Sequence, residues 1–319
     1  METAVCCMCG SAKQRELFKK KEKFGITKEF FTVVSCADCG FFYVSPRPLE
    51  AEIALFYPET YSWKESTGES SLLSRAINGI EKLYRFHLLK YEVSKVKRFT
   101  KIREGRILDV GCGSGDRLLV FRNQGYDAYG VEISSAALYA KEKLNLKVFK
   151  GDVSSAGFQD NFFDIITLYN VLEHLHDPRR LLREAKRILK DKGFLVIEVP
   201  NTASLQFNIF KKRWAAFDVP RDLSYFSPKH LENLLAQEGF RVENIDYYSS
   251  WWHPPTFTLS LFPGLDPQFS WKGSYPFIKS MAARFAWAII TVMIAPVFVF
   301  FEAVIKRSAL ITVYAKKND

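Results

Sequence analysis

One short stretch, RILDVGCGSGD at residues 106–116, constrains the fold of this chain more than any other. A β-rich run ends near Asp109, glycines follow at Gly111, Gly113 and Gly115, and a helix-like pattern begins after them. A strand, a tight glycine turn and a helix in this order let the backbone approach a nucleotide-like ligand without obstruction by Cβ atoms. We therefore expect a ligand-binding loop between a strand and a helix.

Three further strand-like segments end in polar residues that suit the same ligand. DAYGVEI ends around Glu132, LKVFKGDV around Asp152 and FDIITLYNV around Asn170. In a doubly wound sheet the carboxyl ends of parallel strands meet at one edge, and ligands bind there. The strands alternate with helical patterns of roughly 10 to 15 residues, which implies parallel βαβ units. A carboxylate at Glu132 could accept hydrogen bonds from both hydroxyls of a ribose.

Helix-start signals mark the second half of this α/β domain. Asp177-Pro178 opens a predicted helix that runs to Leu189, and Gly193 begins a fifth strand. A serine cap and a proline in the first turn, at Ser227 and the residue after it, predict another helix. RVENIDYY then reads as a sixth strand.

These residues together resemble the class I S-adenosyl-L-methionine (SAM)-dependent methyltransferases. The loop DVGCGSG matches that family's Asp/Glu-x-Gly-x-Gly-x-Gly pattern, whereas the dehydrogenase fingerprint places its last two glycines three apart. The resemblance continues through FDIITLYNVLEHLHDP, KGFLVIEVPN and FSPKHLENLLAQEGF, most of residues 100–247. It implies a Rossmann-like seven-stranded sheet whose last strand, SALITVYAKK at 308–317, returns antiparallel. A Rossmann-like domain for another nucleotide is the alternative.

The resemblance also implies which residues hold SAM. The loop from Asp109 would line the methionine part, Glu132 the ribose and Asp152 the adenine, with Asn170 and Val171 beside the transferable methyl group. The full expected set is Asp109, Gly111, Cys112, Gly113, Gly115, Glu132, Ile133, Asp152, Val153, Asn170 and Val171.

Candidates for catalysis follow the fourth strand. Methyl transfer is an in-line displacement, so the enzyme must position a nucleophile and, for a hydroxyl or carbon acid, remove its proton. His174 and His176 lie at the expected cofactor edge, and imidazole titrates near neutrality. A histidine that only hydrogen-bonds backbone is the alternative, and we prefer it for His176.

A second source of candidates is FDVPRDLSYFSPKHL, residues 217–231, which could cover the acceptor. Relatives often carry histidine at the position of Asp222. Its carboxylate could act as the base, or it could hold Arg221 in a salt bridge. Tyr225 could orient the acceptor or pack in the core. We read His230 as a surface or packing residue.

The N-terminus carries a metal-ligand pattern. Cys6-x-x-Cys9 and Cys36-x-x-Cys39 are each followed by glycine, and two such knuckles complete a tetrahedral four-thiolate site for structural Zn²⁺. Cys7 could replace Cys6, and reduced cysteines without metal are the alternative. We expect the KKKEK run inside the loop, at 19–23, to be a solvated tip, with nucleic-acid binding as the minor alternative.

The stretch FAWAIITVMIAPVFVFFEAVI, residues 285–305, raises the question of a membrane span. It lies within an insertion, 249–307, between the last two strands, so a lone crossing would separate those strands. Pro296 interrupts it and basic residues flank both ends, which suits an anionic cytoplasmic surface. We therefore predict monotopic attachment to the membrane surface through residues 277–307. A buried homodimer helix is the competing interpretation.

The chain thus divides into four predicted parts. These are a zinc-ribbon module (1–45), a helical linker or lid broken near Pro58 and Gly68 (46–100), the methyltransferase domain (101–248 and 308–319) and the hydrophobic insertion (249–307). Aromatic residues of the linker, Tyr57, Tyr61 and Trp63, could close over a ligand, although packing is the preferred role.

Function is expected from the ribbon and methyltransferase together. The net charge of +10 suits nucleic acid, an anionic membrane or a phosphorylated substrate. NVLEH replaces the Asn/Asp-Pro-Pro-Tyr/Phe motif of base methylation, which favours a small-molecule or lipid-linked glycan acceptor over nucleic acid. With the ribbon included, the chain resembles the subgroup that modifies sugars, which implies a role in polysaccharide synthesis. METAVCCMCG lacks an apolar leader, so we expect the protein in the cytoplasm. An isoprenoid-quinone O-methyltransferase and a SAM-sensing regulatory protein are the alternatives.

Overall fold

The computed structural model describes residues 1–57, 72–248, 253–262 and 290–318. Its centre is a seven-stranded sheet in the order β10-β11-β8-β7-β4-β5-β6. Strands β4 to β8 pair in parallel, and β11 is antiparallel to both β8 and β10. The expected α/β class and the antiparallel last strand are confirmed. The strands are β4 (Gly105–Val110), β5 (Tyr126–Glu132), β6 (Lys147–Lys150), β7 (Phe163–Tyr169), β8 (Leu189–Pro200), β10 (Phe240–Asp246) and β11 (Leu310–Lys317).

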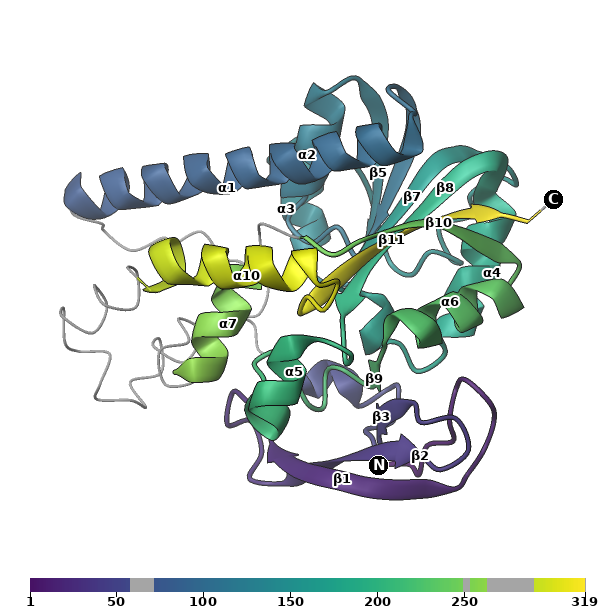
Figure 1. Cartoon of the computed structure of the whole chain (residues 1–319). Coiled ribbons are helices and arrows are strands. Elements are labelled where there is room, and N and C mark those ends of the chain that lie inside the picture. Colours follow the sequence, from purple (N-terminus) through teal and green to yellow (C-terminus); the bar gives the residue numbers. More distant parts are fainter. Residues whose placement is uncertain (58–71, 249–252, 263–289, 319) are drawn as a thin grey trace.

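Helices cover both faces of this sheet (Figure 1). One apolar cluster joins a face of the sheet to α1 (Leu72–Thr100), α2 (Asp116–Asn123) and α3 (Ala136–Glu142). Another cluster joins the opposite face to α4 (Pro178–Ile188) and α6 (Pro228–Gln237). Central strands are buried on both sides, which explains their continuous apolar sequences.

The predicted helix starts of the second half are confirmed, but one strand boundary is wrong. Asp177 accepts hydrogen bonds from Arg179 N and Arg180 N, and a proline occupies the first turn of α4. Strand β8 begins at Leu189 and not at Gly193, because Leu189 already pairs with Phe163 before a register shift. The helical pieces predicted before residue 100 are a 3₁₀ turn at Ile53–Phe56 and the continuous helix α1. Pro58 and Gly68 lie outside the described residues.

The N-terminal residues form a second, antiparallel sheet in the order β1-β2-β3-β9. Its strands are β1 (Gln14–Lys21), β2 (Phe30–Cys36), β3 (Phe42–Val44) and β9 (Ser224–Tyr225). Strand β9 belongs to the connection between β8 and α6, where Tyr225 pairs with Phe42. The main domain therefore supplies the edge strand of the N-terminal sheet, and the two parts share a border.

The described residues of the insertion between the last two strands are mainly helical, as expected. They include α7 (His253–Leu261), a π-helical turn at Ile290–Ile294 and α10 (Ala295–Val304), with Pro296 in the first turn of α10. Beside it lies α5 (Leu205–Phe210) (Figure 1). Within the described part of the chain, no helix has the length and apolar character needed to cross a bilayer.

Candidate functional site

The glycine loop after β4 requires glycine at two positions for steric reasons. Gly111 and Gly115 have φ values of +71° and +83°, a region that residues with a Cβ rarely occupy. A Cβ on Gly111 would lie 2.6 Å from Val171 Cγ2, and one on Gly115 would lie 2.6 Å from Leu146 Cδ1. Gly113, also at positive φ, faces open space. The loop therefore packs its outer glycines against the protein and leaves its centre accessible.

Glu132 lies at the end of β5, beside this loop. Its Oε2 accepts a hydrogen bond from Gly113 N at 2.9 Å, and its Oε1 accepts one from Ser134 N at 2.8 Å. A carboxylate has about four acceptor positions, so both oxygens can still accept from hydroxyl groups. The structure thus places Glu132 and the glycine loop in contact, as the ribose assignment requires.

The other residues expected to hold the cofactor differ in their exposure. Asp152 accepts hydrogen bonds from Ser155 N and Ser155 Oγ, which lower its pKa. Ile133 is 75% exposed next to Glu132, whereas Val153 is buried in the core. Cys112 is also buried and packs near Gly130. Its thiol therefore faces the core, and only its backbone belongs to the loop surface.

Asp109, at the end of β4, has a polar atom without a partner. The side chain is buried; its Oδ1 accepts a hydrogen bond from Thr167 Oγ1 at 2.6 Å, while its Oδ2 has no hydrogen-bond partner among the described residues. Burial raises the pKa of Asp109, and the positive charge of Arg117 opposes that shift. A buried acceptor without a donor is costly, so this atom fits a ligand donor such as an ammonium group.

A cavity of about 140 Å³ lies beside the carboxyl ends of the strands. Its polar wall combines residues that follow β7 with residues of the connection before α6, and Lys23 of the N-terminal part joins them. Its apolar wall comes from strand ends, that same connection and α7. The lining residues are Lys23, Asn170, Glu173, His174, Pro200, Ala215, Ala216, Asp218, Asp222, Thr256, Leu259 and Leu310.

Two predicted catalytic residues meet in this cavity. His174 Nδ1 lies 3.1 Å from Asp222 Oδ1 and 3.1 Å from the carbonyl oxygen of Arg221. Burial lowers the pKa of His174, but the hydrogen bond and charge of Asp222 outweigh burial and raise it to about 9. Both neighbours of Nδ1 are acceptors, so Nδ1 carries a proton and the neutral ring has its lone pair on Nε2.

Glu173 is a cavity residue that the sequence did not single out. The side chain is buried, and its Oε2 has no hydrogen-bond partner in the described part of the protein. Burial raises its pKa to about 8, opposed by His174. Burial therefore favours the neutral Glu173 carboxyl, which can donate a hydrogen bond. The only sequence signal was its place in NVLEH.

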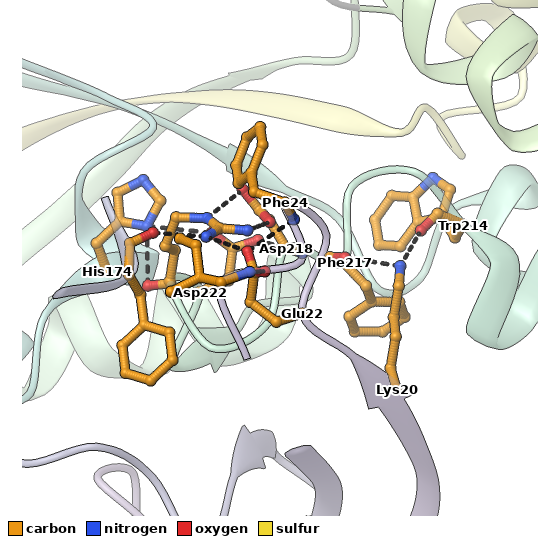
Figure 2. Close-up of polar contacts among 11 residues, drawn as sticks. Lys20, Glu22, Phe24, His174, Trp214, Phe217, Asp218 and Asp222 are labelled. Carbon is orange, nitrogen blue, oxygen red and sulfur yellow. Dashed lines mark hydrogen bonds and ion pairs between the residues drawn. The ribbon is translucent and has the colours of Figure 1, made fainter. Parts of the chain in front are cut away.

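The alternative in which Asp222 holds Arg221 in a salt bridge does not match the structure. Arg221 Nη1 instead pairs with Glu22 Oε1 at 2.7 Å, and its Nε donates to Asp218 Oδ2 at 2.9 Å (Figure 2). The side chains of Arg221 and Asp222 point to different partners because two hydrogen bonds fix Asp222. Asp218 N donates to Asp222 Oδ2, and Asp222 N donates to the carbonyl oxygen of Asp218, which leaves Asp222 Oδ1 against His174. Asp222 therefore contacts the imidazole of His174, and Arg221 binds Glu22 of the N-terminal part.

The KKKEK run is also not the solvated tip that was expected. Glu22 is buried, and Lys20 Nζ donates to the carbonyl oxygens of Trp214 and Phe217 at 3.2 and 2.7 Å (Figure 2). Lys23 lines the cavity, and Lys20 and Glu22 bind the connection between β8 and α6. The partners of Lys20 and Glu22 are some 200 positions away, which a local charge pattern cannot reveal.

The remaining aromatic candidates pack or bond away from the cavity. Tyr225 is 1% exposed, and its ring centroid lies 4.4 Å from that of Phe217, so it occupies a core position. His176 Nε2 lies 2.9 Å from the carbonyl of Pro48, which confirms the backbone-bonding alternative. Tyr57 is the exception, with its ring centroid 6.3 Å from that of His174. Tyr61 and Trp63 lie outside the described residues.

The four predicted metal ligands converge. The Sγ atoms of Cys6, Cys9, Cys36 and Cys39 all lie within 4.8 Å of one another, and the Cys6–Cys39 and Cys9–Cys36 pairs are 3.5 Å apart. A zinc–sulfur bond of about 2.3 Å in a tetrahedron spaces sulfurs about 3.8 Å apart, so these thiols fit Zn²⁺. Cys7 lies outside the group, with its Sγ 3.9 Å from Ser224 Oγ.

Comparison with known proteins identifies the class. A family model described as a methyltransferase domain matches residues 83–245, about half of the chain. The chain therefore belongs to this family and is a SAM-dependent methyltransferase. The buried Asp109, the glycine loop and Glu132 are the residues that fit SAM.

Named relatives share the same region. The chain is 31% identical over 177 residues to the demethylmenaquinone methyltransferase of Thermotoga maritima, covering 48% of this chain and 77% of the relative. It is 26% identical over 208 residues to a ubiquinone biosynthesis O-methyltransferase of Rickettsia bellii, covering 61% and 82%. A solved SAM-dependent methyltransferase of Thermotoga maritima is 26% identical with a TM-score of 0.41, covering 54% and 80%.

Proposed function

We propose that this methyltransferase methylates a hydroxyl group of a sugar, with His174 as the general base. The acceptor would be a sugar or lipid-linked intermediate of cell-surface polysaccharide synthesis, met in the cytoplasm. The observation that carries the proposal is the His174–Asp222 pair, 3.1 Å apart on the wall of a cavity that also includes Asn170, beside the glycine loop. A hydroxyl needs a base to lose its proton, and the pair supplies one.

Each residue near the cofactor has a defined task in this reaction. SAM supplies an electrophilic methyl group when it is bound. Asp109 Oδ2 would accept a hydrogen bond from the ammonium group, and Glu132 would accept hydrogen bonds from the ribose hydroxyls. The space at Gly113, in the centre of the loop, would let the ligand contact the backbone of the loop directly. These contacts would position the methyl donor for displacement by the acceptor oxygen, and such positioning lowers the barrier.

His174 acts through one nitrogen. Asp222 and the Arg221 carbonyl hold the Nδ1–H, so Nε2 would take the proton of the acceptor hydroxyl. The carbon–oxygen bond would form as the methyl–sulfur bond of SAM breaks, and S-adenosylhomocysteine would leave. Asp222 is then a positioning residue that stabilises the imidazolium, and not itself the base. This division of tasks replaces the earlier alternative in which Asp222 removes the proton.

The cavity wall suits a hydroxyl-rich acceptor. Protonated Glu173 can donate a hydrogen bond, while Asp218 can accept one and Asn170 can do both. A dry apolar cavity of about 150 Å³ admits one benzene ring, so about 140 Å³ is the size of a single six-membered ring. Sugar hydroxyls need both donors and acceptors, which this wall offers.

The four thiols are proposed to hold a structural Zn²⁺. All four coordination positions would be filled by protein, so the ion has no catalytic position open. His230 supports the site by contacting the carbonyl oxygen of Cys39 at 3.3 Å and Ser227 Oγ at 2.9 Å. Together with strand β9 and Lys20, the ion would fix the wall of the acceptor cavity.

Isoprenoid-quinone methylation is the second candidate. Two relatives are a demethylmenaquinone methyltransferase and a ubiquinone biosynthesis O-methyltransferase. Pro200, Leu259 and Leu310 give the cavity an apolar wall that a quinone ring could contact. A phenolic hydroxyl would use the same His174 base. The two candidates differ in the acceptor and not in the site.

Methyl-labelled SAM separates these functions. Purified enzyme is incubated with a sugar-lipid fraction, a demethylated quinol and nucleic acid, and the labelled product is identified by mass spectrometry. His174→Asn should bind SAM in calorimetry with unchanged affinity and transfer methyl at least a hundredfold more slowly. His176→Asn is the matched control, because His176 bonds only backbone outside the cavity. Label in quinol alone supports the second candidate, and SAM binding without transfer to any acceptor would support a sensing role.

A further inference from the structure

The surface of α10 has an apolar row that the fold does not cover. Six large side chains on the π-helical turn and α10 are between 53% and 70% exposed. Their spacing of one, three and four places them on one helical face, spanning about three turns. A contiguous exposed apolar face of this kind marks an interaction surface. We call it the α10 face; its residues are Met293, Ile294, Val297, Phe300, Phe301 and Val304.

The opposite side of the same helix is fixed to the protein. Phe298 stacks on Phe257 of α7 with ring centroids 4.3 Å apart, and Val299 is fully buried. Glu302 is also fully buried and accepts hydrogen bonds from Gln206 N and Nε2 at 3.2 and 2.8 Å. The helix is therefore held in place by its inner side, and the α10 face is presented outward.

The exposed charges of the segment that carries this face have one sign. Between residues 290 and 307 the sole carboxylate is Glu302, which is buried against α5. Lys306 and Arg307 are exposed where the helix ends. Every strongly exposed side chain of this segment that the structure describes is therefore apolar or basic. An apolar stripe with basic ends complements an anionic lipid surface.

We propose that the α10 face lies on an anionic membrane surface. The ten residues of α10 measure about 15 Å, half of the roughly 30 Å hydrocarbon core, so the helix suits the plane of the interface. A second copy is the less suitable occupant. A twofold contact pairs a surface with itself, and this surface offers Lys306 and Arg307 no exposed carboxylate to meet.

The same surface is one helix away from the acceptor cavity. Thr256 and Leu259 of α7 line the cavity, while Phe257 of α7 packs on Phe298 of α10. Docking of the α10 face would therefore bring the cavity near lipid headgroups. This consequence, that the acceptor is carried by a membrane lipid, rests on the proposed function; the docking itself does not.

Vesicle flotation of the full-length protein tests the docking. The probes are vesicles of phosphatidylcholine alone and of phosphatidylcholine with phosphatidylglycerol, without SAM or acceptor. We expect binding to the anionic vesicles that weakens as salt rises. Val297→Asn/Phe300→Asn should reduce partitioning at least tenfold, and Lys306→Gln/Arg307→Gln should reduce it on the order of tenfold. Leu138→Asn, an exposed apolar position on α3, is the control that should bind normally.

Two results would overturn the proposal. One is binding to anionic vesicles that survives the Val297→Asn/Phe300→Asn change. The other is no vesicle binding, with sedimentation showing a dimer that the same change dissociates, which would assign the face to a second copy. Because no methyl transfer is measured, a failure here leaves the methyltransferase proposal standing. A failure of all acceptors likewise leaves the docking intact.

Discussion

The carboxylate of Glu22 and the guanidinium of Arg221 are 2.7 Å apart and fully buried, although 199 positions separate them in the chain. Glu22 belongs to the N-terminal part, and Arg221 precedes the Asp222 that contacts His174. Backbone oxygen of Phe56 accepts a further hydrogen bond from Arg221. The cysteine-bearing sheet and the cavity lined by His174 and Asp222 therefore form one structural unit.

Removing this ion pair should be costly. Glu22→Gln removes the charge of one of the carboxylates paired with the buried guanidinium and leaves that of Asp218, and breaking a buried pair costs about 3 to 5 kcal/mol. Urea unfolding measures the change in the free energy of unfolding. The matched control is Glu16→Gln, which removes an exposed pair with Lys19 on the same sheet and should cost less than about 1 kcal/mol. Equal effects of the two variants would contradict a special role for Glu22.

Metal content should separate Cys7 from the four converging thiols. Cys9→Ser removes a ligand and should lower bound zinc well below one ion per chain, whereas Cys7→Ser should keep it, because Cys7 Sγ points toward Ser224. Atomic absorption measures the zinc and thermal unfolding the stability. Zinc lost from Cys7→Ser and retained by Cys9→Ser would show that the ligand set is different.

Methyl transfer should increase with pH up to about pH 9. The proposed base is neutral His174, and its pKa of about 9 in the free enzyme leaves most molecules protonated at pH 7. Asp222→Asn removes the charge that raises this pKa, so the rise in kcat/KM should shift to lower pH while kcat falls. The measurement is kcat/KM between pH 6 and pH 10, with His176→Asn as the control. An identical profile for Asp222→Asn would refute the pairing.

The loop glycines should differ in their tolerance of a methyl group. Gly111→Ala would place a Cβ 2.6 Å from Val171 Cγ2, whereas Gly113→Ala meets open space and only backbone strain of about 1 to 2 kcal/mol. Gly111→Ala should therefore destabilise the protein more and weaken SAM binding at least tenfold. Adding Val171→Ala should restore part of the stability. Calorimetry measures SAM binding, and urea unfolding measures stability. If the effects of Gly111→Ala and Val171→Ala on the free energy of unfolding simply add, the clash between the two positions is excluded.

The sequence predicted what is local. The strand ends at Asp109, Glu132 and Asn170 were found because a short apolar run, a turn and a polar residue all occur within one segment. The cysteines were found for the same reason, since each knuckle spans four positions. The start of β8 was missed because pairing with Phe163, and not the nearby glycine, decides where the strand begins.

Long-range pairing explains the remaining errors in the site. His174 and Asp222 were both predicted, but nothing in the sequence says that they face each other. A salt bridge from Arg221 to its neighbour Asp222 stayed open as an alternative because the partner in the structure, Glu22, lies 199 positions away, just after β1. Glu173 was overlooked because a buried carboxyl is recognised only when its surroundings are known.

The two-residue strand β9 has a consequence for synthesis of the chain. Strand β3 ends at Val44, and its outer partner is Ser224–Tyr225, about 180 residues later. A ribosome adding about 5 to 20 residues per second needs on the order of ten to forty seconds to supply that partner. Throughout this interval the nascent N-terminal sheet has an open edge. The sheet can be completed only after strands β4 to β8 and the segment that carries His174 and Asp222 have been synthesised.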